Sequence, residues 1–149
     1  MSTSPTPEVL SFDDLDIRTA YAVWQLRQDV FVVEQDCVYR DLDGRDDAPG
    51  TRHVVLRDGA DVVGYLRILD EPGRARIGRV VLARAARGRG LADPLMRAAL
   101  ADIGDREVVL DAQSPLAGWY ATFGFEVTGK EFLDDGIPHL PMRRAARPA

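Results

Sequence analysis

The stretch Arg87-Gly88-Arg89-Gly90-Leu91-Ala92 decides how this chain is organised. It follows the apolar run 80–82 and opens an amphipathic run over 91–103, so the pattern predicts a strand, a tight glycine loop and a helix. Glycines let such a loop approach a ligand closely. The first turn of the helix leaves backbone N–H groups unpaired and adds roughly half a positive charge. The junction therefore predicts an anion site, most often one for phosphate.

The loop does not match two well-known glycine motifs that bind phosphates. A Walker A loop ends in Gly-Lys-Ser/Thr, which is absent here. The dinucleotide motif needs a third glycine where Asp93 stands, and it belongs to a first strand–helix unit. Arg-Gly-Arg-Gly also occurs in RNA-binding tails, but here it lies between an expected strand and an expected helix.

Length and composition predict one globular domain over residues 1–149, with residues 1–7 as a flexible tail. No apolar run approaches the ~20 residues of a membrane span, so no membrane partner is expected. Residues 1–8 lack the basic and apolar regions of a secretory signal. The single cysteine, Cys37, excludes an internal disulfide and the usual multi-cysteine zinc site. These features favour a cytoplasmic location.

The net charge of −5 is unevenly distributed along the chain. Residues 1–70 carry 7 Arg against 14 acids, residues 71–100 carry 7 Arg against 2 acids, and residues 101–149 carry 5 basic against 8 acidic groups. The positive segment surrounds the glycine loop, where an anion is expected. The acidic remainder favours a cationic second substrate and, with a pI near 5.0, argues against nucleic acid.

Residue patterns predict a mixed α/β chain. Helices are expected over 14–32, 91–103 and 114–123, the first of them capped by Asp13 or Asp14. Strands are expected over 9–12, 53–56, 60–69, 76–82, 108–110, 125–127 and 139–143. Hairpins come first and a strand–helix–strand unit follows, so a doubly wound sheet is not expected.

Two patterns resemble the GNAT superfamily of N-acetyltransferases. Arg87, Gly90 and Ala92 fill the fixed positions of its pyrophosphate-loop motif, Arg/Gln-x-x-Gly-x-Gly/Ala. Residues 119–125 resemble the Tyr-x-x-x-Gly-Phe segment that ends the family's last helix, and Gln113 stands where many members carry Asn.

Further segments resemble the ElaA-like subfamily of this superfamily, namely 26–39, 41–46, 52–53 and 135–139. Together the matching segments span residues 20–142. The resemblance implies the GNAT fold: an α/β architecture with a mixed, largely antiparallel central sheet. About six or seven strands, splayed at the cofactor site, and about four flanking helices are then expected.

The resemblance also implies acetyl-CoA as acyl donor and no metal. The loop amides would hold its pyrophosphate, while Arg87 and Arg89 add charge. The strand before the loop is expected to pair its backbone with the pantetheine arm, and an N–H near Leu82 to polarise the thioester carbonyl. The implied cofactor-binding residues are Val80, Val81, Leu82, Arg87, Gly88, Arg89, Gly90, Leu91, Ala92, Gln113 and Tyr120.

Acetyl transfer also needs the departing thiolate to be protonated. By its position in the family's motif, Tyr120 is the expected general acid, because a phenol with a pKa near ~10 stays protonated at neutral pH. The alternative is a packed aromatic beside Trp119 and Phe123.

The base that deprotonates the amine stays open at this stage, with Glu34, His53, His139, Asp43 and Asp46 as candidates. Glu34 is favoured as an acceptor-site carboxylate, against the alternative of a solvated acid. The acidic loop 39–47 is expected to form an acceptor-site rim rather than a calcium site, because its spacing does not fit an EF-hand. Residues expected to bind the acceptor are Glu34, Tyr39, Asp43, His53 and His139.

The resulting functional prediction is an N-acetyltransferase acting on a primary amine of a small molecule or peptide. The alternatives are transfer of another acyl group and a CoA-binding sensor without catalysis. Many relatives are dimers, so a homodimer is compatible with the resemblance.

Overall fold

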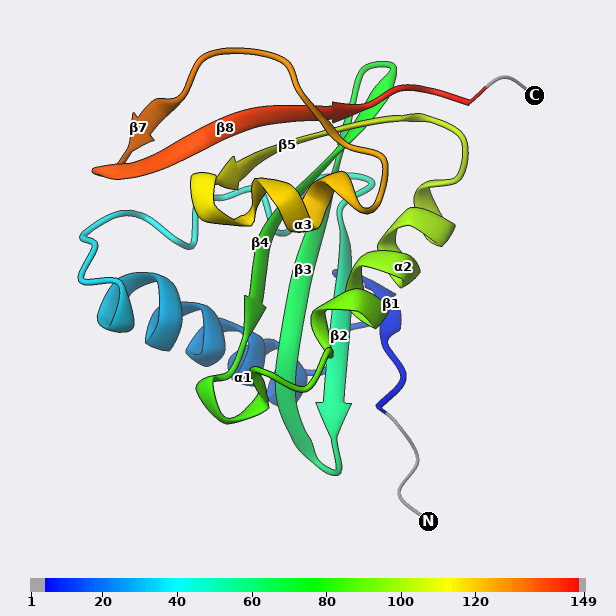
Figure 1. Cartoon of the computed structure of the whole chain (residues 1–149). Coiled ribbons are helices and arrows are strands. Elements are labelled where there is room, and N and C mark those ends of the chain that lie inside the picture. The colour runs from blue at the N-terminus through cyan, green and yellow to red at the C-terminus, as the bar shows by residue number, and fades with distance from the viewer. Residues whose placement is uncertain (1–4, 148–149) are drawn as a thin grey trace.

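The computed structural model describes residues 5–147, and an eight-stranded sheet forms their centre (Figure 1). The strand order is β1-β2-β3-β4-β5-β8-β6, and β7 pairs with β8 beside this path. Among the strands of this described part, only β4 and β5 pair in parallel. The strands are β1 Glu8–Ser11, β2 Arg52–Asp58, β3 Asp61–Glu71, β4 Arg74–Leu82, β5 Glu107–Gln113, β6 Glu126–Val127, β7 Phe132–Asp134 and β8 Ile137–Arg144.

Three α-helices flank this sheet in the described residues. They are α1 Ile17–Arg27, α2 Ala92–Ile103 and α3 Ala117–Ala121, with a π-helical turn at Gln28–Glu34 and 3₁₀ turns at Arg84–Ala86 and Ser114–Leu116. The expected mixed and largely antiparallel sheet is thus confirmed. It has one strand more than expected, and one α-helix fewer.

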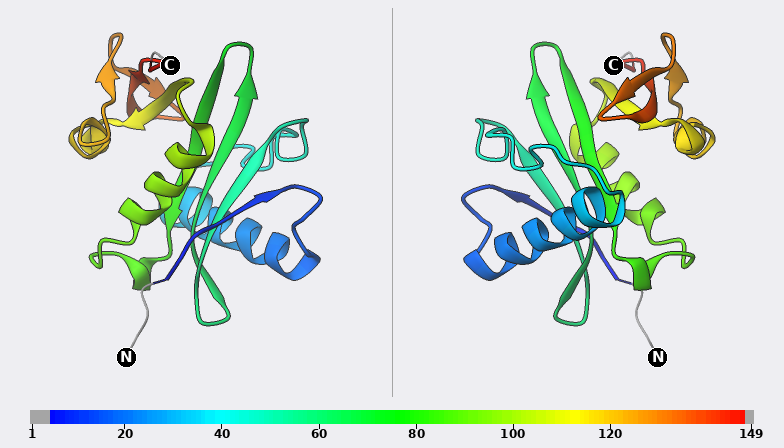
Figure 2. Two further views of the ribbon diagram at one scale, coloured as in Figure 1. Left: turned by 90° about the vertical axis from the view of Figure 1, so that its right-hand side faces the viewer. Right: turned by 90° about the vertical axis from the view of Figure 1, so that its left-hand side faces the viewer.

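The two longer helices cover opposite faces of the sheet (Figure 2). Neighbouring residues of a strand point to opposite faces, so Val54 and Leu66 pack with α2 while Val55 and Tyr65 pack with α1. All four side chains are fully buried. The central strands are therefore apolar on both faces, which explains their near-continuous hydrophobic sequences.

The first helix starts later than expected and ends differently. Its cap is Asp16, whose Oδ1 accepts a hydrogen bond from the Thr19 N–H at 2.7 Å. Asp14 instead belongs to the preceding turn, where its N–H donates to the Ser11 hydroxyl at 3.3 Å. The expected caps Asp13 and Asp14 are therefore wrong. Beyond Arg27 the helix widens into the π-helical turn.

The hairpin between β7 and β8 was not expected from the sequence. Its turn is formed by Asp135 and Gly136, both with positive φ (48° and 80°), and β7 pairs with the first residues of β8. Asp-Gly is a strong hairpin signal. The preceding strand has only three residues, all exposed, so hydrophobic alternation does not mark it.

The parallel strands β4 and β5 pair only at their beginnings. The register joins Arg74 to Glu107 and ends with Arg76 opposite Val109. Beyond that pair the two strands diverge, so the later part of β4 has no sheet neighbour on its β5 side. The splay expected at the cofactor site is present.

An ionic cluster ties the long loop 35–51 to the sheet. Arg27 is fully buried, and its guanidinium donates to Asp41 Oδ2 at 2.8 Å and to Asp46 Oδ1 at 2.6 Å. Arg67 on β3 donates to both carboxylate oxygens of Asp43 at 2.8 and 2.9 Å. Each of these acids is satisfied by an arginine from the body of the protein, which fixes the loop's position.

Removal of the buried arginine is expected to destabilise the fold strongly. Arg27→Leu leaves Asp41 and Asp46 buried without their main cation, which costs about 3–5 kcal/mol of unfolding free energy. Urea unfolding measures this value. The exposed Arg97→Leu on α2 is the matched control, expected to change it by less than about 0.5 kcal/mol. Similar values for the two variants would contradict the structural role of the cluster.

Candidate active site

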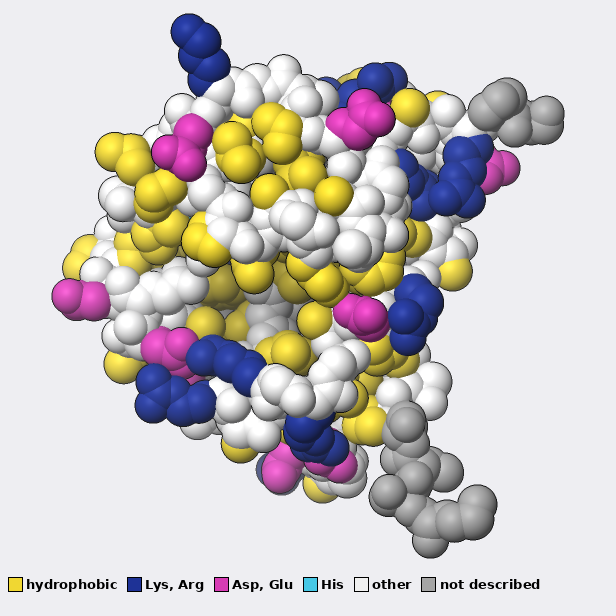
Figure 3. All heavy atoms as spheres, viewed as in Figure 1, with side chains coloured by type: hydrophobic (Ala, Val, Ile, Leu, Met, Phe, Trp, Pro, Cys, Tyr) yellow, Lys and Arg dark blue, Asp and Glu magenta, His cyan; other side chains and the backbone are white. Residues whose placement is uncertain are grey.

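A cavity of about 950 Å³ occupies the gap between β4 and β5. Figure 3 shows a hollow on this face, with apolar side chains deep inside and charged side chains along its edge. Its walls come from the π-helical turn, the following loop, β3, β4, β5, α3 and the β7–β8 hairpin. The cavity therefore unites segments from the whole chain.

Most of the residues predicted for a site lie around this one cavity. From the expected donor set, the lining includes Val80, Val81, Leu82, Arg87, Ala92, Gln113 and Tyr120. From the expected acceptor set, it includes Glu34, Tyr39, Asp43 and His139. The described lining does not include Gly88, Arg89, Gly90, Leu91 or His53.

The glycine loop has the geometry that its sequence predicts. Gly88 and Gly90 both have positive φ (76° and 72°), a conformation that disfavours a side chain. Within residues 5–147 no side chain caps the N-terminus of α2, which leaves its first N–H groups available to a ligand. Leu91 is buried in the core, and Arg89 forms an exposed ion pair with Asp58 at 3.2 Å.

The end of β4 presents backbone groups to the gap. The Ala83 N–H bonds back to Val63 O on β3 at 2.8 Å. Because N–H groups alternate between the two edges of a strand, the Leu82 N–H points away from β3 and into the gap. The Leu82 carbonyl on the same edge accepts from Arg87 Nη2 at 3.2 Å. Polarisation of a thioester carbonyl by this edge stays a prediction.

A β-bulge bends β4 just before this edge. Tyr65 pairs with Val81 but Arg67 pairs with Gly78, so β4 has one residue more than β3 between these pairs. Arg79 in the bulge has a φ of 55°, a strained conformation for a residue that is not glycine. Its Nε lies 2.9 Å from Asp41 Oδ1 in the ionic cluster.

Tyr120 lies in the wall formed by α3. Its ring packs edge-on against Trp119, with centroids 4.8 Å apart, and against Phe125 at 6.1 Å. The residue is only 5% exposed, and this burial raises the pKa of its phenol to about 12. The phenol is therefore protonated at neutral pH and can donate a hydrogen bond into the cavity.

Glu34 faces the glycine loop rather than the acceptor side. Arg87 donates to both of its carboxylate oxygens, at 2.7 and 3.0 Å. These hydrogen bonds, together with the charges of Arg87 and Arg84, lower the pKa of Glu34. A carboxylate in this arrangement is a poor proton acceptor.

The acidic loop does not form the open rim that its sequence suggested. Asp41 and Asp46 are buried, and both bind arginines of the ionic cluster. Tyr39 donates its phenolic O–H to Asp41 Oδ1 at 2.7 Å. Asp43 reaches the cavity but is bound to Arg67. The interpretation as a cation-attracting rim is therefore wrong, because cations of the protein already neutralise these acids.

His53 belongs to the protein interior. It is 2% exposed, its Nδ1 lies 2.6 Å from the Tyr65 hydroxyl, and its Nε2 lies 3.0 Å from the Asp46 carbonyl. Burial lowers the pKa of its imidazole. Both ring nitrogens are thus occupied, which leaves His53 no free atom for an acceptor.

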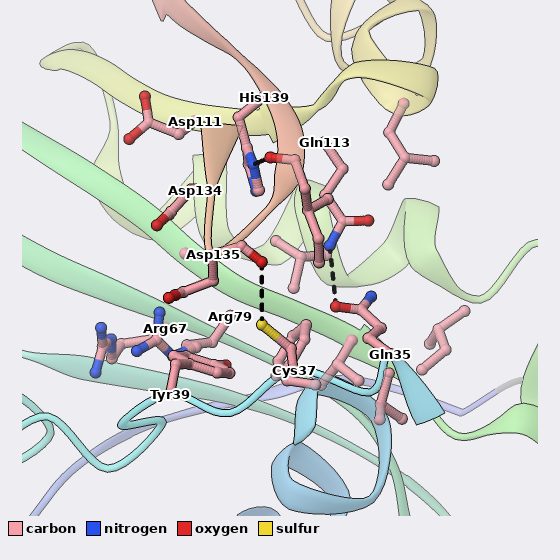
Figure 4. A pocket seen from close by; sticks show the side chains of 18 of the residues that line it. Gln35, Cys37, Tyr39, Arg67, Arg79, Asp111, Gln113, Asp134, Asp135 and His139 are labelled. Atoms are coloured by element: carbon pink, nitrogen blue, oxygen red, sulfur yellow. Dashed lines mark hydrogen bonds between the residues drawn. The ribbon is translucent and has the colours of Figure 1, made fainter. Parts of the chain in front are cut away.

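A different set of acids faces the cavity. Asp111 on β5 and Asp134 and Asp135 on the β7–β8 hairpin line it, and they lie in the left half of the view in Figure 4. The Cys37 thiol donates to the Asp135 carbonyl at 3.4 Å, and Gln113 donates to Gln35 at 3.4 Å. Sequence reasoning missed these acids, although 135–139 stood out as a subfamily segment.

Comparison with known proteins identifies the family. Residues 21–146 match the family described as an acetyltransferase (GNAT) domain. The chain belongs to the GNAT acetyltransferase family. Enzymes of this family use acyl-CoA donors and bind an acceptor substrate. The expected family and fold are therefore confirmed.

The relatives support the expected ElaA-like subfamily. A UPF0039 protein of Mycobacterium tuberculosis is 49% identical over 137 residues, covering 88% of this chain and 87% of the relative. The crystal structure of Escherichia coli ElaA matches with a TM-score of 0.88 at 36% identity, covering 93% of this chain and 98% of ElaA. The crystal structure of an acyl-CoA N-acyltransferase from Pseudomonas aeruginosa matches with a TM-score of 0.91 at 40% identity. The match covers 95% of this chain and 100% of that protein.

Two kinds of feature are absent from residues 5–147. No group of three or more His, Cys, Asp or Glu side chains in this part of the chain is arranged to hold a metal ion. No helix in the same range is long and apolar enough to cross a membrane.

The ion pair of Asp43 predicts how stability depends on pH. Burial alone would raise the pKa of Asp43, but its hydrogen bonds and charge interaction with Arg67 hold the pKa well below the usual range. A lowered pKa in the folded state stabilises the protein above the unfolded value near ~3.9, and this contribution is lost as the pH falls below it.

We therefore expect Asp43→Asn to reduce the unfolding free energy at pH 7 and to flatten its decline below pH ~4. Urea unfolding between pH 7 and pH ~3 measures both effects. Asp47→Asn, an exposed change on the same loop, serves as the control and should follow the wild-type curve. An Asp43→Asn curve parallel to the wild type would contradict the predicted linkage.

Proposed function

We propose that the protein transfers the acetyl group of acetyl-CoA to a primary amine of a small molecule or peptide by direct attack. One observation carries the proposal: β4 and β5 separate beside the N-terminus of α2, so an unpaired strand edge, Arg87 and the first residue of α2 line one cavity. An extended thiol arm with a pyrophosphate at one end fits such a cavity.

The donor side of the cavity supplies both kinds of contact. The amides from Gly88 to Ala92, with Arg87, offer N–H groups and charge to a pyrophosphate. The edge of β4 over Val80–Leu82 offers backbone groups to the amides of the pantetheine arm, as in the addition of a strand. Arg87 keeps its alignment through Glu34, which we propose to be a positioning residue.

The same edge supports the chemical step. As the amine attacks, the thioester oxygen gains negative charge, and the Leu82 N–H that points into the gap is positioned to stabilise it. Tyr120 donates its phenolic hydrogen to the departing sulfur. Because burial raises the pKa of this phenol to about 12, Tyr120 remains the hydrogen donor throughout the neutral pH range.

The proposed activity predicts a measurable thiol product. We expect CoA release from acetyl-CoA to be accelerated by at least one member of a panel of alkyl, aryl and peptide amines, as measured with a thiol reagent. Acetyl-CoA and CoA alone should raise the melting temperature, because a ligand that binds only the native state stabilises it. Propionyl-CoA and succinyl-CoA serve as matched alternative donors.

Each contrary result contradicts a different part of the proposal. Stabilisation by CoA without turnover across the panel would favour a CoA-binding sensor. Faster turnover with another acyl-CoA would show that the transferred group is that acyl group rather than acetyl. A melting temperature unchanged by every CoA compound would overturn the donor site itself.

The role of Tyr120 predicts a separate effect on rate. We expect Tyr120→Phe to lower kcat about 100-fold, because general acid assistance to the departing thiolate is lost. The dissociation constant for CoA should change by less than about twofold, since the ring and its packing remain. Tyr21→Phe, which makes the same chemical change on the exposed face of α1, is the control. A kcat for Tyr120→Phe equal to that of Tyr21→Phe would exclude the role.

A further inference from the structure

We propose that His139 is the catalytic residue that removes the proton from the attacking ammonium group of the acceptor. This inference rests on the proposed N-acetyltransferase function and concerns its acceptor half. It follows from the hydrogen bond that fixes the imidazole, from the position of the ring in the cavity and from the charges that surround it.

The hydrogen bond of His139 determines which nitrogen is free. Nδ1 lies 2.7 Å from the backbone carbonyl of Ile137. A carbonyl only accepts hydrogen bonds, so Nδ1 carries its hydrogen in both the neutral and the charged imidazole. Nε2 is therefore the nitrogen that can accept and release a proton, and in the neutral ring it carries a free lone pair.

The sheet directs this ring into the cavity. His139 lies on β8 opposite Gln113 of β5, and its imidazole stacks on Phe132 of β7 with centroids 5.8 Å apart. In Figure 4 the ring points from β8 toward the space between Gln113 and Asp135. The ring of this cavity-lining residue is held by a carbonyl at Nδ1 and stacked on an aromatic face, so Nε2 is the polar atom left for a substrate.

Carboxylates on the facing walls suit an incoming cation. Asp111 on β5 has one distant ionic partner, Arg76 at 3.5 Å. Asp134 and Asp135 on the hairpin have no ion pair within the described residues 5–147. Cys37, whose pKa is raised by burial and by Asp135, lines the cavity from the opposite loop, as do Tyr39, Asp43 and Arg45. The cations in the lining all pair with carboxylates of the protein, namely Arg45, Arg67, Arg76, Arg79 and Arg87. This half of the cavity therefore favours an ammonium group.

The other candidate bases are already engaged. Glu34 is bound by Arg87, and Asp43 is bound by Arg67, and in both cases the arginine lowers the pKa of the carboxyl group. His53 has both ring nitrogens occupied in the interior. Asp46 is buried against Arg27. Of the five candidate bases from the sequence, His139 is therefore the one that combines a free basic atom with a position in the cavity.

The proton balance of the reaction is complete with these groups. The ammonium nitrogen gives one proton to Nε2 of His139, which releases it to solvent. The freed nitrogen lone pair forms the bond to the acetyl carbon, the carbon–sulfur bond breaks, and its electron pair stays on sulfur. Tyr120 gives its phenolic proton to the sulfur, and the second proton, which the nitrogen loses as the amide forms, restores the phenol. The products are the amide, CoA thiol and the one proton that His139 has released to solvent.

A spectroscopic test does not depend on turnover. The chain has two histidines, and their hydrogen bonds require opposite neutral forms. His53 donates from Nε2 to the Asp46 carbonyl, whereas His139 donates from Nδ1 to the Ile137 carbonyl. We expect ¹⁵N NMR of histidine-labelled protein to detect one neutral imidazole of each kind, with the His139 signals identified by their absence in His139→Gln. A neutral Nε2–H form for His139 would overturn the inference.

A kinetic test measures the function of the base. The probes are the alkyl amine that the wild type turns over fastest and trifluoroethylamine, which is far less basic and largely neutral at neutral pH. We expect His139→Gln to lower kcat/KM for the alkyl amine about 100-fold at pH 7. This loss should shrink as rising pH deprotonates the amine in solution, and it should be at least tenfold smaller for trifluoroethylamine.

The control is Leu133→Ala, an exposed change on the same hairpin outside the cavity lining, and it should retain the wild-type profile. CoA stabilisation of the His139→Gln variant verifies that its fold and donor site are intact. Equal losses with both amines, or a wild-type pH profile in His139→Gln, would overturn the base role while leaving the proposed function standing. Absence of turnover by the wild type with every amine would instead overturn the proposed function, and the base role with it.

Discussion

The early end of pairing between β4 and β5 is the constraint on which the site depends. After Arg76 and Val109 the strands share no further pairs, and the bulge at Arg79 bends β4 next to the opening. A left-handed residue that is not glycine costs on the order of 1–3 kcal/mol. Arg79 contacts Asp41, which also binds Arg27. One buried ionic cluster therefore holds both the bent strand and the loop that faces it.

The sequence predicted those parts of the fold that local signals determine. The glycine loop, the strand before it and α2 follow from glycine placement and apolar periodicity, and the structure confirms them. The short strand β7 could not be found in this way, because its three exposed residues carry no alternation. The π-helical turn after Arg27 was also missed, since its residues continue the helical pattern and its wider hydrogen bonding leaves no local mark.

The candidate site was predictable on its donor side and less so on its acceptor side. Donor contacts rest on backbone geometry that a motif reports directly. The charge of the acceptor side depends on which acids find arginines, and those pairs join distant segments: Glu34 meets Arg87 across 53 residues, and Asp43 meets Arg67 across 24. The density of acids in 1–70 therefore points to loop 39–47, whereas the cavity-lining acids without an ion pair among residues 5–147 are Asp134 and Asp135 on the β7–β8 hairpin. Only the folded chain distinguishes a neutralised carboxylate from an available one.

The two groups proposed to handle protons differ in the way that their tasks require. Tyr120 is surrounded by aromatic rings, and because burial disfavours the phenolate, the raised pKa keeps it a donor. His139 lies on β8, the strand that pairs with β5, and there a backbone carbonyl fixes its Nδ1 hydrogen and leaves Nε2 to accept a proton. An apolar wall thus holds the donor and a polar wall holds the acceptor. The two walls belong to α3 and β8, which flank the end of β5. The divergence of β5 from β4 would thus open one cavity in which proton removal and proton delivery take place on different walls.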